Sequence, residues 1–233
     1  MLGARSEALR TEGVNPMRTG FQSELETLKV EILRMGARVS DALALAVAAL
    51  NQGDQQKAAQ VIQGDTDIDL REVEIERQCL RLLALQQPMA SDLRMISSAL
   101  KVITDLERMA DHATNVAKAT IRLAGQPLIK PLVDIARMAQ LVQEMLRKGL
   151  RAYTERDAAA AREYVALDDE IDHLYNAIFR ELLLMMIHDQ SVIEQATQLL
   201  FVAQNLERFG DHATNLAEWT IYMVTGDRPA LNT

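Results

Sequence analysis

Apolar residues recur at steps of three and four positions along most of the chain, and this spacing predicts amphipathic helices. The first such stretch runs from about Phe21 to Asn51 and ends at Gly53 and Asp54. Residues that cost little in a helix, such as Ala, Leu, Met and Glu, recur throughout, whereas the 233 residues include only 10 Gly and 5 Pro. The pattern therefore predicts an all-α fold.

The chain contains an internal repeat. Residues 105–121 (DLERMADHATNVAKATI) and residues 205–221 (NLERFGDHATNLAEWTI) are identical at 11 of 17 positions. Upstream, three residues of each half align at an offset of 103, namely Asp65, Ile68 and Asp69 with Asp168, Ile171 and Asp172. The offset changes from 103 to 100 between these segments, so we expect the length difference in the connection after the second helix of each half. The chain is thus a duplication.

Each half reads as three long helices joined by short connections. Asp54 and Asp157 are candidate N-caps for the second helices, because a short carboxylate accepts the free amide hydrogens of a first turn. Short connections make neighbouring helices antiparallel, which predicts two tandem three-helix bundles resembling spectrin repeats. We expect residues 17–125 and 126–228 to form the two bundles, followed by a tail at 229–233.

Composition and charge narrow the class of protein. Residues 1–16 lack the apolar run of a secretory signal, so we interpret them as a disordered leader or an extension from a misassigned start before Met17. No apolar run reaches the roughly 18 residues of a membrane span. The single Cys79 excludes an internal disulfide, and the net charge of −8 argues against nucleic-acid binding. These features predict a cytoplasmic protein.

Acidic residues recur four positions apart on two helices of each half. In the first half, Asp65 and Asp69 lie on the second helix, and Glu107 and Asp111 lie on the third. A helix turns by about 100° per residue, so each pair lies on one side of its helix. Like charges at this spacing destabilise a helix by about 0.2–0.5 kcal/mol, and a bound cation would offset the repulsion. We therefore predict metal ligands at eight positions: Asp65, Asp69, Glu107, Asp111, Asp168, Asp172, Glu207 and Asp211.

The metal and the role of the neighbouring residues stay open. Oxygen ligands suit magnesium, manganese or iron, and an adjacent His extends the choice to nickel or zinc. Alternatively, Arg108 and Arg208 pair with the acids on a solvated face. His112 and His212 follow the acids by one position, about 100° around the helix, and are expected to face solvent. A phosphoacceptor histidine would need that exposure.

An enzymatic alternative uses the same helices. Glu170 and His173 have the Glu-x-x-His spacing of di-iron or di-manganese carboxylate oxidases, but those bundles need two such pairs and only one is present. A metal store without specific partners is a third reading. The chain contains no nucleophile arrangement, phosphate loop or dinucleotide fingerprint. We therefore expect no enzymatic activity and no organic cofactor.

The segments LERMADHATNVA and LERFGDHATNLA closely resemble the repeated signature of the PhoU family, an acidic residue followed four positions later by Asp. The resemblance extends to VIQGDTDIDLREVEI and QPMASDLR, so it covers nearly the whole chain from Met17. Glu107 with Asp111 and Glu207 with Asp211 match the signature, and the four other acids match the positions that face it. Ala110 stands where the family usually has Gly, which should alter packing more than ligation.

The resemblance implies a fold, cofactors and partners. It implies two three-helix bundles that carry multinuclear iron or zinc clusters in some members. It also implies a negative regulator of the phosphate-starvation response and of phosphate uptake. Such a protein contacts the ATPase subunit of a phosphate ABC transporter and a sensor histidine kinase, and associates with the membrane only through those partners. Whether the chain forms a homodimer is left open.

Overall fold

The computed structural model describes residues 16–231, and these residues form helices and their connections, without a strand. The predicted leader lies outside this range except for Pro16, which begins the first helix. The helices are α1 (Pro16–Gln52), α2 (Gln55–Gln86), α3 (Ser91–Arg122), α4 (Val133–Glu155), α5 (Ala158–Tyr164), α6 (Leu167–His188) and α7 (Ile193–Thr225), with a short 3₁₀ turn η1 (Gln190–Val192) before α7. The all-α prediction is confirmed.

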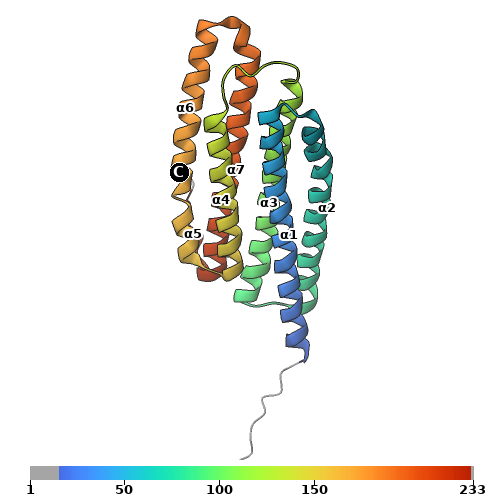
Figure 1. Cartoon of the computed structure of the whole chain (residues 1–233). Helices are drawn as coiled ribbons and strands as arrows, with labels where there is room; N and C mark the ends of the chain where they lie inside the picture. The colour runs from blue at the N-terminus through green and yellow to red at the C-terminus, as the bar shows by residue number, and fades with distance from the viewer. Residues whose placement is uncertain (1–15, 232–233) are drawn as a thin grey trace, which may run out of the picture.

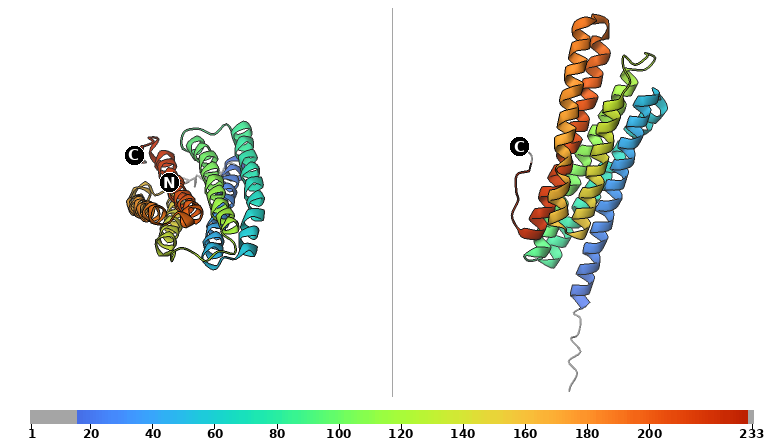
Figure 2. Two further views of the ribbon diagram at one scale, coloured as in Figure 1. Left: turned by 90° about the horizontal axis from the view of Figure 1, so that it is seen from above. Right: turned by 60° about the vertical axis from the view of Figure 1, so that its left-hand side comes forward.

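Two bundles lie side by side (Figure 1). Helices α1, α2 and α3 pack together in the first bundle, and α4 to α7 pack together in the second. The bundles meet mainly where α3 packs against α7 (Figure 2). The two central helices run antiparallel, so the α2–α3 connection and the α6–α7 connection lie at opposite ends of the molecule (Figure 1). The duplicated sequence is therefore arranged about an approximate twofold axis between α3 and α7.

The helix starts follow the predicted caps. The Asp54 carboxylate accepts the backbone N–H groups of Gln56 at 3.0 Å and Lys57 at 3.1 Å. At the equivalent place in the second bundle, the Asp157 carboxylate accepts two backbone N–H groups at 2.9 Å. Both carboxylates satisfy amide hydrogens that have no partner inside the helix. The two N-cap predictions are confirmed.

The second helix of the second half differs from the prediction, because it is divided into α5 and α6. Val165 and Ala166 between them keep right-handed helical angles, φ −59° and ψ −27° at Val165 and φ −58° and ψ −15° at Ala166. The N–H of Asp168 donates to the carbonyl of Val165 at 2.9 Å, a bond over three residues that tightens the turn. The chain thus bends immediately before a predicted ligand.

One apolar core runs through both bundles and fixes the helices that carry the acids. Met109 and Phe209 occupy equivalent positions of α3 and α7, and both are fully buried. The acidic positions two residues away are thereby held at the edge of the core. Among the described residues, no helix is both long enough and apolar enough to cross a membrane.

Candidate metal-binding groups on the two bundles

The first acidic group (Asp65, Asp69, Glu107 and Asp111) lies where α2 packs against α3. Partial burial raises the pKa of Asp65, and the charges of Asp69 and Asp111 raise it further. Burial also raises the pKa of Glu107, with a second contribution from Asp111 and smaller ones from Glu72 and Asp69. These couplings show that the four predicted residues lie close enough to repel one another. Glu72, which the sequence analysis missed, belongs to their surroundings.

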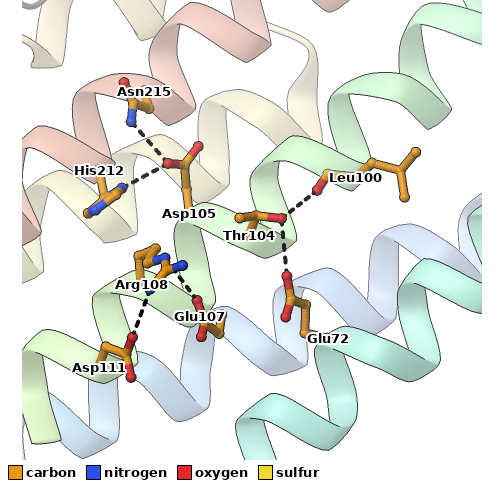
Figure 3. A network of polar contacts seen from close by, with 9 residues as sticks. All are labelled: Glu72, Leu100, Thr104, Asp105, Glu107, Arg108, Asp111, His212 and Asn215. Atoms are coloured by element: carbon orange, nitrogen blue, oxygen red, sulfur yellow. Dashed lines mark hydrogen bonds and ion pairs between the residues drawn. The ribbon is translucent and has the colours of Figure 1, made fainter.

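Neighbouring cations and a hydrogen-bond donor partly offset the negative charge of the first acidic group. Arg108 lies 3.3 Å from an Asp111 oxygen and 3.4 Å from a Glu107 oxygen (Figure 3). The Arg108 side chain is 57% exposed, and an exposed ion pair contributes only about 0–1 kcal/mol. The Thr114 hydroxyl and the Lys118 ammonium both lower the pKa of Asp65, against the effect of burial. The predicted arginine pairing is therefore present here, but it leaves the pKa of Asp65 and of Glu107 raised.

The second acidic group (Asp168, Asp172, Glu207 and Asp211) lies between α6 and α7. Burial raises the pKa of Asp168 to about 6, with further contributions from Asp211 and Asp172. Burial likewise raises the pKa of Glu207 to about 7, again with Asp211 and Asp172 as the largest charge effects. The pKa of Asp211 is also raised, mainly by burial and then by Asp172. The structure thus brings these four residues together as well.

Gly210, which has no side chain, allows α6 and α7 to lie close together at the second acidic group. A Cβ atom at Gly210 would lie 3.3 Å from Oδ1 of Asp168 and 3.3 Å from Cδ1 of Ile171, both tighter than ordinary contacts. The equivalent residue of the first bundle is Ala110, which is buried. The first bundle therefore accommodates a methyl group where the second places a carboxylate.

The donor chemistry of both groups fits a hard or borderline cation. All eight donors are carboxylates, and the Oδ1 atom of Asp65 is buried with no hydrogen-bond partner among the described residues. The side chains do not, however, converge on one point: within residues 16–231 no three His, Cys, Asp or Glu side chains form a group that could hold a metal ion. The acids of each group lie near enough to raise one another's pKa, and metal ligation stays a prediction.

The two histidines lie between the bundles, so the expectation that they face solvent is wrong. The rings of His112 and His212 lie 5.5 Å apart between centroids. Nδ1 of His212 is 2.8 Å from Oδ1 of Asp105, and Nδ1 of His112 is 2.9 Å from Oδ1 of Asn205. Burial lowers the pKa of His112. The side of each helix that is open in one bundle is covered by the other bundle.

Two asparagines complete this contact in equivalent positions. Asn215 donates to Asp105 at 3.0 Å, and Asn115 donates to Asn205 at 3.1 Å. Each bundle thus binds one side chain of the other with a His and an Asn, and Figure 3 shows the half of this contact in which His212 and Asn215 bind Asp105. His112 lies next to its own equivalent, His212, near the approximate axis. Asp105 and Asn205 begin the two aligned segments, but nothing in the sequence pairs them with residues about a hundred positions away.

Glu170 and His173 do not join the second acidic group. Glu170 accepts Nη2 of Arg137 on α4 at 2.8 Å, and Nδ1 of His173 lies 2.5 Å from the carbonyl oxygen of Asp169. Both side chains are on the exposed part of α6. The arrangement offers no support for the oxidase alternative.

Comparison with known proteins identifies close relatives. The family model of the PhoU domain matches residues 32–120 and 135–220. The chain is 43% identical to the phosphate-specific transport system accessory protein PhoU homolog of Clostridium acetobutylicum, over 91% of this chain and 97% of that protein. It is 42% identical to the homolog of Aquifex aeolicus, over 88% and 92%.

Solved structures agree with the sequence comparison. The crystal structure of PhoU from Pseudomonas aeruginosa superposes with a TM-score of 0.85 at 36% identity, covering 89% of this chain and all of that one. The phosphate transport system regulatory protein PhoU from Streptococcus pneumoniae gives a TM-score of 0.85 at 34% identity, over 90% and 99%. Both the fold and the sequence of these proteins are therefore similar over nearly their whole length.

Proposed function

The chain belongs to the PhoU family, and from that premise we propose that it is a regulatory accessory protein of a phosphate transport system. It acts as a negative regulator that restrains phosphate uptake and the phosphate-starvation response when phosphate is plentiful. The observation that carries the proposal is the match of the PhoU domain to both halves of the chain. The relatives with this arrangement carry names that describe accessory and regulatory roles in phosphate transport.

The proposed partners are the ATPase subunit of a phosphate ABC transporter and a sensor histidine kinase. The protein would work in the cytoplasm and reach the membrane only through these partners. Long helical bundles support this proposal, because they offer extended faces of the kind to which helices and loops of other proteins dock. Self-association into a homodimer is compatible with the same faces.

The acidic groups support a second part of the proposal, that iron or zinc regulates the protein. Asp65, Asp69, Glu107 and Asp111 would hold metal in the first bundle, and Asp168, Asp172, Glu207 and Asp211 in the second. Manganese, nickel or magnesium would use the same carboxylate oxygens. A bound cation supplies positive charge that offsets both the burial and the repulsion by Asp211 and Asp172, which together raise the pKa of Asp168 and Glu207. The acids themselves connect α2 to α3 and α6 to α7.

Elemental analysis tests the metal part directly. Protein purified without chelator is compared with a variant in which Glu107, Asp111, Glu207 and Asp211 are all changed to Ala. A matched control changes the exposed Glu74, Glu76, Glu163 and Glu194 to Ala, which removes the same charge elsewhere. We expect stoichiometric metal in the native chain and the control, and none in the first variant with helicity retained. Equal metal in all three would contradict ligation by the acids.

A binding experiment tests the regulatory part independently. The purified chain is immobilised and exposed to the ATPase subunit, to the cytoplasmic part of the kinase, and to an unrelated ATPase subunit as control. We expect specific capture of the phosphate system's proteins, with weaker capture after chelation. Absence of binding to both proposed partners in metal-loaded and metal-free forms would exclude the proposed contacts, whatever the metal content.

A further inference from the structure

The chain turns back on itself after α7. Gly226 has φ +88° and ends the helix, with its N–H donating to the carbonyl of Tyr222 at 2.9 Å. Glycine adopts this left-handed conformation without steric cost. The following residues run back along α7 (Figure 2, right). We call Gly226–Leu231 the C-terminal strap.

The strap satisfies a buried carboxylate. Glu218 on α7 is only 5% exposed. Its Oε2 atom accepts Nε of Arg228 at 2.9 Å and lies 2.7 Å from Nη2, and its Oε1 atom accepts the backbone N–H of Leu231 at 2.8 Å. Both carboxylate oxygens are thus bound by the strap. Hydrogen bonds to an ionised carboxylate are stronger than hydrogen bonds between neutral groups.

An aromatic ring completes the contact with the guanidinium. The Cζ atom of Arg228 lies 4.0 Å from the centroid of the Trp219 ring, a cation–π distance. Tyr222 supports that ring edge-to-face at 6.1 Å. Leu231 packs against the edge of the core. Glu218 and Trp219 therefore form a site with a carboxylate for a guanidinium, a flat face for stacking, and an apolar contact three residues further along the bound segment.

The site exists in only one of the two bundles. The positions equivalent to Glu218 and Trp219 in α3 are Lys118 and Ala119, which offer neither a carboxylate nor a ring. Glu218 also follows Asp211 by about two helical turns, so it lies on the same side of α7 as the second acidic group. Negative charge on this side favours the approach of a basic segment.

The C-terminal strap is held at the site of Glu218 and Trp219 by few contacts. Arg228 is 46% exposed although its carboxylate partner is buried. Among the residues that the structure describes, the hydrogen bonds of the strap other than those to Glu218 are that of Gly226 to Tyr222 and those between Asp227 and Thr225, close to the turn itself. A segment from another molecule that carries Arg and, three residues later, an apolar residue could make the same contacts.

We propose that Glu218 and Trp219 form a binding site for an arginine-bearing extended segment of a partner protein, and that the C-terminal strap occupies this site until the partner displaces it. The site does not depend on the proposed role in phosphate regulation. The strap is an internal competitor: tethering gives it an effective concentration in the millimolar range, so only a favourable segment replaces it.

Fluorescence of Trp219, the single tryptophan, reports occupancy of the site. The probe is a peptide with the sequence of residues 226–233, GDRPALNT, added to a chain that ends at Thr225. We expect saturable binding to the shortened chain and at least about tenfold weaker binding to the full chain, because the tethered strap competes. Glu218→Gln in the shortened chain, or Gln for Arg in the peptide, should abolish the signal.

Three outcomes would overturn the proposal. One is no binding to a shortened chain of native helicity, and another is binding that Glu218→Gln leaves unchanged. The third is a concentration-dependent dimer of the full chain that Arg228→Gln dissociates, since the site would then serve exchange of straps between two copies. If the shortened chain fails to fold, the full-length Arg228→Gln variant takes its place, and it should bind the peptide more tightly than the native chain does.

Discussion

The two acidic groups have the same four residue types at equivalent positions, yet burial and neighbouring charges raise the pKa values further in the second group. The pKa of Glu207 is raised to about 7 and that of Asp168 to about 6, whereas Glu107 and Asp65 have smaller shifts in the same direction. Lys118 is one reason, because it lowers the pKa of Asp65 while the equivalent residue of the second bundle is an acid.

Hydrogen bonding adds to the difference in pKa between the two acidic groups. The Thr114 hydroxyl lowers the pKa of Asp65, whereas the equivalent Thr214 hydroxyl is buried and has no hydrogen-bond partner among the described residues. Gly210 in turn lets Asp168 approach α7 closely. Duplicated carboxylates therefore need not have duplicated electrostatics: the ionised form is disfavoured more strongly in the second group than in the first.

The largest expected difference in stability is between substitutions of Asp105 and Asn205, the equivalent residues in the contact between the bundles. Asp105→Ala removes a buried acceptor and leaves His212 and Asn215 without their partner, which should lower the free energy of unfolding by about 2–3 kcal/mol. Asn205→Ala, at the equivalent and more exposed position, should cost about 1 kcal/mol. Urea unfolding of both variants measures this, and equal losses would show that the two contacts are energetically equivalent.

Substitutions that replace a carboxylate of the acidic groups by a neutral amide should have the next largest effect on stability. In metal-free protein at pH 8, Glu207→Gln should raise the free energy of unfolding by about 1–2 kcal/mol, a range reduced for solvent screening. The substitution removes a charge that is disfavoured by burial first and by Asp211 and Asp172 second. Glu107→Gln should raise it by less than about 1 kcal/mol, since Arg108 already offsets part of the repulsion. Chemical denaturation after chelation is the measurement. Destabilisation by Glu207→Gln would contradict the claim that the charge of Glu207 is disfavoured in the folded protein.

The pH dependence of stability should show the same asymmetry. Asp168 and Glu207 have folded-state pKa values above their unfolded values, so their contribution is fully present below about pH 4 and is lost as pH rises through about 6 and 7. Metal-free protein should therefore melt a few degrees lower at pH 8 than at pH 5. The double variant Asp168→Asn with Glu207→Gln should flatten this slope, and the variant Asp65→Asn with Glu107→Gln should flatten it less.

The smallest expected effect concerns the packing of the second group. Gly210→Ala should change stability by less than about 0.5 kcal/mol, because a gain of about 0.5–1 kcal/mol in helix preference is offset by close contact with Asp168 and Ile171. Ala110→Gly, which lacks such an offset, should cost about 0.5–1 kcal/mol. Thermal unfolding of both variants tests this, and a clear stabilisation by Gly210→Ala would show that Asp168 moves aside freely.

The local features of this protein could be predicted from its sequence. Helices follow from apolar spacing, and the caps at Asp54 and Asp157 follow from the hydrogen-bonding capacity of a short carboxylate. The resemblance to the PhoU family implied that the acid pairs of neighbouring helices face one another, because it matches four of the aspartates to the positions that face the signature. These features depend on interactions within one helix or between neighbours along the chain.

Only the tertiary structure decided how the halves meet. His112 and His212 are expected to face solvent on an isolated helix, and packing of α3 against α7 partly buries them against Asn205 and Asp105. The bend before Asp168 and the strap bound to Glu218 were likewise missed. The physical reason is that helix periodicity reports which side of a helix avoids water, whereas the identity of a distant covering surface depends on contacts between residues far apart in the chain.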